Sequence, residues 1–472
     1  MFVHLRILLI FILLIIHLTL IRAQSEPHSY AVDTIINSCI IVDEIQISGN
    51  KKTEAGIILR ELTFKQGDTI EAGKLDKILT ESTENILKTS LFHQAVITLE
   101  ETDKKITFQV NVTERWYWWI WPLLENPDRN FNDWWQHQDI TRLSAGVHFQ
   151  HENMRGRMEK LNLRVLGGYR TYLAANYEWP YINRKKTLGL GILASYYTKY
   201  EVNYATVNNR QLFYHGNNIM LKSANYAIYT RFRPGNHVSH ILTLQYADVI
   251  VNDTIRLLNP EFQLYSNKFD LLSINYSIKV DYRDNRNYPL KGWYTEAETG
   301  IVKNLSTDYN QRSIRFSARG YKSPAARIYA ACEIAARFTG PKVKPYPLQN
   351  SLGYDRDFVR GYEFMVIEAP HYWLFKTQLR YAVLPNLKIR LPLIKSDKFN
   401  PIPLSLYTGI HCDMGKAFPA LNPEINSMQG QLLTGYGIGI DFVTFYDKVV
   451  RIEYTFRHTG QGGLFIHFMA MI

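Results

Sequence analysis

The amino-acid sequence predicts a mainly β protein, in which one small α/β domain precedes a C-terminal transmembrane antiparallel β-barrel. Three observations predict it. The chain begins with a segment typical of exported proteins, residues 39–115 follow a strand, helix, helix, strand, strand pattern, and residues from about 141 onward alternate with a period of two. Strands that hide an apolar face in every second residue can cross a membrane only as a closed barrel, because lipid offers the backbone no hydrogen-bond partner.

The first 23 residues have the order of a secretory signal peptide. His4 and Arg6 give a short basic start, residues 8–16 are all apolar, and the small residue Ala23 ends the segment. We therefore predict cleavage after Ala23. The alternative is an uncleaved membrane anchor, although the apolar stretch is short for a spanning helix of about 20 residues.

Composition narrows the class further. Mean hydropathy is only -0.21, while aromatic residues reach 13%, which fits a barrel and also a secreted β-rich globule. Cys39, Cys332 and Cys412 are too few for a disulfide framework, and no His/Cys spacing indicates a metal site or another cofactor. The net charge of +11 would suit nucleic acid, but an export signal argues against that partner. A basic barrel lumen and anionic lipid headgroups explain the charge more simply.

Residues 24–115 form the predicted α/β domain. Residues 39–47 alternate as a strand that Gly49-Asn50 ends, and Thr53 is a suitable N-cap for a helix through Ile57, Ile58 and Glu61. Gly67-Asp68 predicts a turn. A second helix has one apolar face, and after Leu91-Phe92 residues 95–100 and 106–114 alternate as two strands. The residues of that apolar face are Leu75, Ile78, Leu79, Ile86 and Leu87.

Residues 116–140 are predicted to be an irregular, tryptophan-rich linker. Indole rings prefer the membrane–water boundary, so we expect this cluster at the bilayer surface, with a small globular aromatic core as the alternative. Pro122 and Pro127 favour an irregular segment over a strand or helix. The six tryptophans are Trp116, Trp118, Trp119, Trp121, Trp134 and Trp135.

Residues 141–472 are the predicted barrel, with an even number of strands near about sixteen. Alternation is clear in residues 161–165, 274–280 and 450–457, whereas residues 199–270 are hard to divide. The chain ends in an apolar strand at 464–472 whose last residue is Ile472.

Several motifs resemble the BamA/TamA outer-membrane assembly family. The segment from Ile45 to Glu100 is similar to a POTRA domain, the periplasmic module of that family, and "TER" at 113–115 closes it. The matching positions are Gly49, Asn50, Thr53, Gly67, Asp68, Leu91 and Phe92.

Four stretches of the predicted barrel resemble the same family. "YEWPYI" at 177–182 is similar to a strand-end motif near the second extracellular loop, and "DYRDNRNYPLKGW" at 281–293 to a turn that we read as a periplasmic hairpin. "GYDRDFVRGYEF" at 353–364 and "HCDMG" at 411–415 resemble the loop tip and the strand wall that meet in the family. The turn residues are Asp281, Arg283, Asp284, Asn285, Pro289 and Gly292; the tip and wall residues are Val359, Arg360, Gly361, Tyr362, Asp413 and Gly415.

The resemblance predicts a latch between the loop tip and the barrel wall. A guanidinium in a lumen binds a carboxylate with two parallel hydrogen bonds, so we expect Arg360 to pair with Asp413. Gly361 would let the tip turn and Gly415 would leave room for it. His411 departs from the aromatic residue that the family prefers. Without the resemblance, an exposed arginine and an unrelated aspartate would be the simpler interpretation.

The resemblance implies an outer-membrane insertase or protein translocase that works without catalysis, nucleotide or cofactor. Its partners would be outer-membrane lipids and unfolded outer-membrane or secreted proteins, with periplasmic chaperones or accessory lipoproteins as further candidates. We also expect a weak barrel seam at residues 141–150, where Ser144, Ala145 and Gly146 make a poor strand. The alternative function is a passive outer-membrane conduit or surface antigen.

Overall fold

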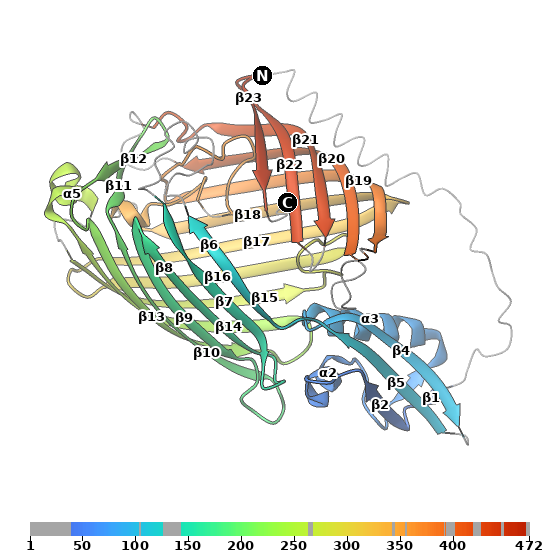
Figure 1. Ribbon diagram of the computed structural model, residues 1–472. Coiled ribbons are helices and arrows are strands. Elements are labelled where there is room, and N and C mark those ends of the chain that lie inside the picture. Colours follow the sequence, from blue (N-terminus) through green and yellow to red (C-terminus); the bar gives the residue numbers. More distant parts are fainter. Residues whose placement is uncertain are drawn as a thin grey trace.

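The computed structural model describes residues 39–102, 105–125, 143–262, 268–341, 345–354, 356–390, 392, 402–418, 426–444 and 448–468. The predicted signal peptide, Trp134, Trp135, Pro127 and Ile472 lie outside the described residues. The chain forms a small N-terminal domain and one large sheet that curves into a barrel (Figure 1). No helix among the described residues is long and apolar enough to cross a membrane.

The N-terminal domain packs two helices on a three-stranded sheet. The sheet order is β2-β5-β4, with β2 parallel to β5 and β4 antiparallel to it. Its core includes Ile57, Ile86, Phe92 and Phe108, each almost fully buried. The elements are β1 (Cys39–Ile41), β2 (Glu44–Ser48), α2 (Ala55–Glu61), β3 (Thr69–Glu71), η1 (Ala72–Lys74), α3 (Leu75–Lys88), β4 (Phe92–Thr102) and β5 (Lys105–Glu114).

Two local predictions in this domain were wrong. The single strand expected at residues 39–47 divides at Val42 and Asp43, because β1 pairs with β3 while β2 pairs with β5. The Asp43 carboxylate accepts a hydrogen bond from the Ile106 amide at this division. Thr53 does not cap α2, which begins after Glu54. Its hydroxyl instead bonds the carboxylate of Glu114.

The barrel sheet has 16 strands, as predicted, and every neighbouring pair is antiparallel. Most connections join sequence neighbours, and β13 pairs directly with β10. The strands are β6 (Trp118–Glu125), β7 (Ser144–Met154), β8 (Glu159–Gly168), β9 (Arg170–Trp179), β10 (Leu188–Lys199), β13 (Leu221–Phe232), β14 (Val238–Val251), β15 (Lys268–Asp281), β16 (Gly292–Asn304), β17 (Asn310–Ala325), β18 (Ile328–Gly340), β19 (His371–Ile389), β20 (Ile402–Phe418), β21 (Leu432–Thr444), β22 (Lys448–Arg457) and β23 (Gly462–His467).

The elements between β10 and β15 explain why residues 199–270 resist division. A separate hairpin of β11 (Glu201–Val207) and β12 (Arg210–His215) stands apart from the barrel sheet. A short helix α5 (Asp253–Leu258) and a 3-10 turn η3 (Pro260–Phe262) follow β14. These elements pack on one another through Val202, Met220, Ile255 and Phe262, so their apolar residues do not follow the barrel's inside–outside alternation.

The irregular linker and the position of the weak seam were both predicted wrongly. Residues 118–125 form β6, which pairs with β7 along its length. Residues 144–150 are therefore in the second strand, paired on both sides. Pro122 lies in β6 because that strand ends the sheet: among the described residues no ladder joins β6 to β23. Proline is tolerated at an edge, where its missing N–H breaks no ladder.

Side chains alternate between an exposed apolar face and a buried polar face. In β22, Tyr454 and Phe456 are exposed, whereas Arg451 and Glu453 are almost fully buried. Exposed apolar residues recur in the same way across the sheet, for example Val165 in β8 and Ile301 in β16. The outer face is therefore suited to lipid and the inner face to a polar lumen.

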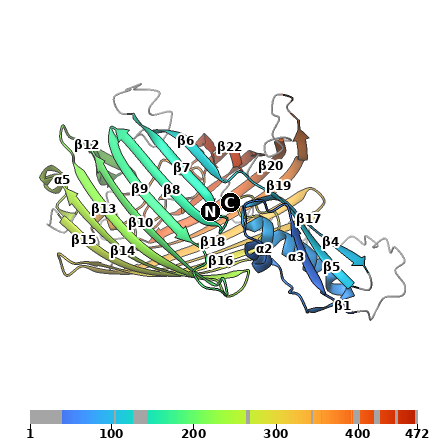
Figure 2. The ribbon, with the colours of Figure 1, turned by 60° about the horizontal axis from the view of Figure 1, so that its bottom comes forward.

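The N-terminal domain lies against one end of the barrel, which we call the domain end (Figures 1 and 2). Helix α2 contacts the turns at residues 180–187 and 233–237. The turn at 282–291 is at the same end, since His237 Nδ1 lies 2.9 Å from the Asp281 carbonyl and its Nε2 lies 3.0 Å from Glu81 of α3.

Candidate functional site in the barrel lumen

Within the described residues 345–354 and 356–370, much of the connection between β18 and β19 packs inside the barrel instead of extending from it. Leu352, Val359 and Tyr362 are almost fully buried. They form one apolar cluster with residues of the barrel wall, including Leu374 of β19 and Leu433 of β21. The tip of this connection, residues 357–364, is called the lumen loop below.

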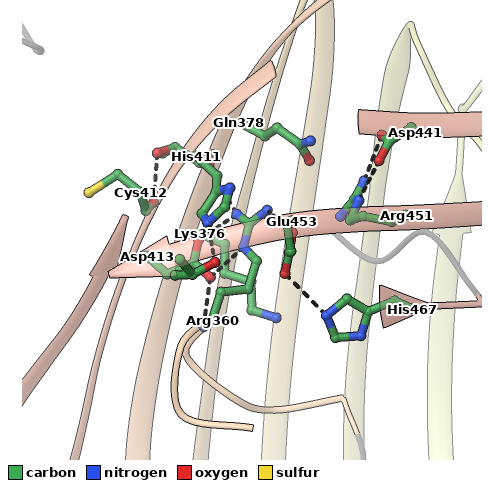
Figure 3. Close-up of polar contacts among 12 residues, drawn as sticks. Arg360, Lys376, Gln378, His411, Cys412, Asp413, Asp441, Arg451, Glu453 and His467 are labelled. Carbon is green, nitrogen blue, oxygen red and sulfur yellow. Dashed lines mark hydrogen bonds and ion pairs between the residues drawn. The ribbon is translucent and has the colours of Figure 1, made fainter. Parts of the chain in front are cut away.

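Arg360 and Asp413 form a bidentate ion pair inside the barrel (Figure 3). Arg360 Nε donates to Asp413 Oδ2 at 2.8 Å and Nη2 donates to Oδ1 at 2.5 Å. The Arg360 backbone amide donates to the same carboxylate at 3.1 Å, and Nη2 also donates to the Thr377 carbonyl. The Arg360 side chain is 2% exposed and that of Asp413 is 0% exposed. The pair therefore has the geometry that gives charge-assisted bonds most of their strength.

Three glycines let the lumen loop approach the wall. Gly361 has φ +92°, a conformation that L side chains rarely adopt. A Cβ on Gly415 of β20 would lie 2.8 Å from Val359 Cγ2, and a Cβ on Gly435 of β21 would lie 1.9 Å from the Arg360 carbonyl oxygen. The sequence identified the first two. Gly435 was missed because nothing in its own strand distinguishes it from neighbouring glycines.

A second ion pair of reversed polarity holds the other side of the lumen loop. Asp357 of the loop accepts two hydrogen bonds from Arg315 of β17, at 3.0 and 2.7 Å. The Tyr372 hydroxyl also donates to Asp357. The loop thus contributes a cation to β20 and an anion to β17. The charged stretch "DRDFVR" contained this signal, but its strand partner could not be chosen from the sequence.

Further buried charges line the wall behind the latch. Arg360 Nη1 lies 3.9 Å from Glu453 Oε2, and the other oxygen of Glu453 lies 3.1 Å from His467 Nε2 (Figure 3). Burial raises the pKa of the Glu363 carboxyl, in the loop, to about 7, and the charge of Glu453 acts in the same direction. His411 lies 3.0 Å from the Thr455 hydroxyl, so a small polar ring occupies the place of the expected aromatic residue.

The turn at residues 282–291 has the expected turn chemistry and one unexpected role. Asp281 pairs with Arg283, and the carboxylate of Asp284 accepts hydrogen bonds from the backbone amides of Asn285 and Leu290. Gly292 has φ +95°, and a Cβ there would lie 2.0 Å from a carbonyl oxygen. Pro289 lies between these groups in the turn.

Tyr288 of the same turn enters the barrel, which the sequence did not predict. Its hydroxyl donates to Asp441 of β21 at 2.7 Å. Asp441 also holds Arg451 of β22 through bonds of 2.6 and 2.9 Å, and the Arg380 guanidinium lies over the Tyr288 ring. The described lumen is therefore braced by the lumen loop and by this domain-end turn.

The N-terminal motif residues shape the domain and its junction. Gly49 has φ +84°, and a Cβ there would lie 1.9 Å from the Val112 carbonyl oxygen. Asn50 Nδ2 donates to the Thr53 carbonyl, Gly67 has φ +89°, and Asp68 accepts from the Lys65 amide. Leu91 and Phe92 are buried in the core. All of these roles are structural.

A buried carboxylate joins the domain to the barrel. Glu61 of α2 is 0% exposed and accepts hydrogen bonds of 2.6 and 2.8 Å from Arg233, in the turn after β13. Although burial alone lowers the pKa of Arg233, the charge of Glu61 holds it above its ordinary value. Arg60 donates to the carbonyls of Lys186, Arg233 and Gly235.

The "YEWPYI" motif lies at this junction, and its expected place near an extracellular loop was wrong. Tyr181 directs its hydroxyl to Glu61 and receives a hydrogen bond from Arg233. The motif ends β9 at the domain end because the chain has turned twice since β7. A second contact, between Asn153 of β7 and Thr53, lies nearby.

The four described tryptophans of the predicted interface cluster do not share one face. By the alternation of β6, Trp118 shares one face with the exposed Ile120, while Trp119 and Trp121, of which Trp121 is as exposed as Trp118, lie on the opposite face and stack at 5.1 Å. Trp116 packs on Trp118 before the strand begins. A β-strand directs successive side chains to opposite faces, which a reading of the cluster as an irregular linker could not anticipate.

Known proteins are similar to this chain both in the N-terminal domain and in the overall fold. Residues 40–115 match the POTRA family model, described as "Surface antigen variable number repeat". BamA from Haemophilus ducreyi lacking POTRA domains 1–3 is similar in fold, with 13% identity, a TM-score of 0.51, and coverage of 91% of this chain and 83% of that one.

Two CdiB structures are also similar. CdiB from Acinetobacter baumannii has 11% identity, a TM-score of 0.48, and coverage of 91% of this chain and 74% of that one. CdiB from Escherichia coli has 10% identity, a TM-score of 0.48, and coverage of 96% and 93%. No curated protein matches the sequence significantly.

Proposed function

We propose that this chain, a single-POTRA member of the BamA/TamA type, inserts or translocates substrate proteins at the bacterial outer membrane. The observation that carries the proposal is the open end of the sheet. Among the described residues, β6 and β23 are the two terminal strands and no ladder joins them. Their outer edges therefore offer backbone groups with which a substrate strand can pair.

The composition of the two terminal strands favours a weak seam. The described part of β23, Gly462–His467, begins with two glycines, which weaken strands. β6 contains Pro122, which has no N–H to donate. Both features limit how many hydrogen bonds the strands can form with each other, so an incoming strand competes on favourable terms.

The POTRA domain supplies a second edge. β2 ends its sheet and pairs only with β5 among the described strands. Its residues Glu44, Gln46 and Ser48 are exposed. An extended segment of an unfolded protein could add to this edge by β-augmentation. In this proposal the domain lies in the periplasm and delivers protein to the barrel without nucleotide or catalysis, aided by chaperones or accessory lipoproteins.

Site-specific photocrosslinking in cells tests the proposal. A crosslinker at Gln46 samples the β2 edge, and one at Leu464 samples the outer face of β23, which is 60% exposed. A matched control at Ile301 samples the outer face of β16, far from the seam in strand order. We expect Gln46 and Leu464 to capture protein substrates that Ile301 does not.

The identity of the captured protein separates the two activities. Several nascent outer-membrane proteins would support an insertase, and one secreted protein would support a dedicated translocase. Equal capture from Leu464 and Ile301, or no capture from Gln46 and Leu464, would contradict the proposal and favour a passive conduit or surface antigen.

A further inference from the structure

Three ligand-type side chains from separate segments converge behind the latch. Glu363 lies in the lumen loop, Glu453 belongs to β22, and His467 ends β23. One possible ligand atom from each lies within 4.8 Å of the other two. His467 Nε2 is 3.1 Å from Glu453 Oε1 and 3.9 Å from Glu363 Oε1. Figure 3 shows Glu453 and His467 directed toward each other.

These separations suit a small divalent ion. Zinc binds imidazole nitrogen and carboxylate oxygen at about 2.0–2.2 Å, so two ligands of a tetrahedral site lie about 3.4 Å apart. The two measured separations from His467 lie on either side of this value. The third separation, between the two carboxylates, is no more than 4.8 Å, so binding an ion would draw the Glu363 side chain toward Glu453.

The two carboxylates are buried and only partly satisfied by neighbouring groups. Oε2 of Glu453 is buried and accepts no hydrogen bond from any group that the structure describes, and the buried Glu363 carboxylate is reached by backbone amides of its own loop, at Gly361 and Glu363. The Glu453 side chain is 1% exposed. The nearest cation, Arg360, is 3.9 Å away and is already bound by Asp413. Burying a carboxylate oxygen without a partner is costly, and binding a metal ion is one of the usual ways to offset that cost.

We infer that Glu363, Glu453 and His467 form a binding site for a divalent transition-metal ion, with zinc as the probe. The mixed nitrogen and oxygen ligand set favours such an ion over magnesium or calcium, which prefer oxygen alone. Water would take the fourth position. The Phe358 ring stacks beside that of His467, with 6.1 Å between ring centroids and 23° between their planes.

The site would join the lumen loop to the last strand of the barrel. Phe364 already contacts Phe465 of β23 at 5.5 Å between ring centroids, so the ion would add a strong bond to a weak apolar contact. Metal binding itself does not depend on the proposed function. The inference goes further than the proposed function because the ion would link the position of the lumen loop to the stability of β23, the last strand of the sheet.

Calorimetry with the full-length protein in detergent tests the site. For this experiment the protein is prepared without a polyhistidine tag, bound metal is removed with EDTA, and the EDTA is removed by dialysis. The protein is then titrated with zinc chloride. We expect one zinc ion to bind per chain. His467→Gln and Glu363→Gln should each weaken binding by at least about 100-fold, since even outer-sphere partners of a metal contribute 10- to 100-fold. His240→Gln, on β14, is the matched control and should bind like the wild type.

A second measurement guards against misfolded variants. Samples are heated to a series of temperatures, and the band of the folded protein on a gel reports the temperature at which the barrel unfolds. Zinc should raise this unfolding temperature for the wild type and for His240→Gln, and not for the two site variants. Glu363 lies in the loop and not in a strand, so its substitution leaves the barrel strands intact. Absence of stoichiometric zinc binding to the wild type, or equal affinity in wild type, His467→Gln and Glu363→Gln, would overturn the inference.

Discussion

Arg360 is held more firmly than an exposed ion pair would hold it. Its guanidinium and its backbone amide both donate to Asp413, and both side chains are buried. The free energy lost when such a pair is broken depends on whether one charge stays buried without its partner. Removing one partner of a buried pair costs about 3–5 kcal/mol, whereas exposed pairs contribute about 1 kcal/mol or less.

We therefore predict that Arg360→Ala and Asp413→Ala each release the lumen loop and impair function. The two effects should not add, because both substitutions break one contact. Protease sensitivity of the loop near Val359 and Tyr362 measures the release, and Arg312→Ala, an exposed arginine of β17, is the control. Partial recovery in Arg360→Asp with Asp413→Arg would support direct contact. Fully additive effects, or a loop equally accessible in all variants, would remove the latch from the mechanism.

A substitution at Gly435 tests the steric contact between the lumen loop and the barrel wall without changing any charge. Gly435→Ala should displace the lumen loop, because the new Cβ would lie 1.9 Å from the Arg360 carbonyl oxygen and neither backbone can yield easily. Gly320→Ala on β17 meets nothing closer than Cys332 Sγ at 3.4 Å and should be tolerated. The same protease assay compares the two variants, and equal protection in both would refute steric contact at Gly435.

At the scale of elements, the POTRA domain and the barrel share a buried charge pair. Helix α2 brings Glu61 to Arg233, Tyr181 and Asn236, which belong to two turns at the domain end. Neither turn is long, so their positions are set by the strands that they join. The domain is therefore oriented by the barrel wall and not only by the short connection after residue 115.

Glu61→Gln should loosen this docking, because Arg233 would lose its charge partner while remaining largely buried. Spin labels at Lys77 and Ala326, in a chain with its cysteines replaced by serine, report the distance between domain and barrel. We expect a broader distance distribution in Glu61→Gln. Glu84→Gln, which removes a half-exposed charge from α3, is the control. A distribution that stays narrow in Glu61→Gln would show that the ion pair does not set the orientation.

The edge strand β6 shows where element prediction from sequence fails. Its alternation was present in the sequence, but two prolines and dense tryptophans favoured an irregular segment. Proline excludes a central strand and permits a terminal one, and only the closing geometry of the barrel decides between them. The error then moved the seam from β6 to β7.

The two faces of β6 lead to a contrast between tryptophans. In variants that keep one tryptophan each, Trp118 fluorescence should be quenched by lipids brominated near the headgroup, because the alternation of β6 places Trp118 on the same face as the exposed Ile120 and Leu124. Trp121 should be quenched much less, because it lies on the face that carries polar residues such as His148, its partner in β7. Equal quenching of both by brominated lipid would contradict the assigned faces.

At the scale of the whole molecule, the polar lumen and apolar exterior predict the solution behaviour. The mature protein should be rich in sheet by circular dichroism, extractable only with detergent, and heat-modifiable on gels. Heat modification is expected because 16 strands share one ladder and unfold together. Recovery of soluble monomer from the periplasm would contradict the membrane barrel.

The sequence predicted the two-part fold, because alternation and short motifs are local signals, whereas the Arg360–Asp413 pair, 53 positions apart, was expected only from the family resemblance of the two motifs. It did not predict the pairs Asp357–Arg315 and Tyr288–Asp441. Those contacts join residues 42 and 153 positions apart, and their partners are set by strand register and barrel curvature. The alternation of the sequence indicated that charged residues such as Arg451 point into the barrel. It did not indicate which of the many other inward charges each one pairs with.

The buried carboxylate of Glu61 also limits which domains can be exchanged between relatives. A barrel grafted to a foreign POTRA domain that lacks an acid at this position would leave Arg233 with no counter-ion at the join. Such a hybrid would need a compensating change in the turn after β13, or would hold its new domain loosely. Lineages that recombine these modules would therefore be expected to inherit α2 and that turn together, as one unit split across two domains.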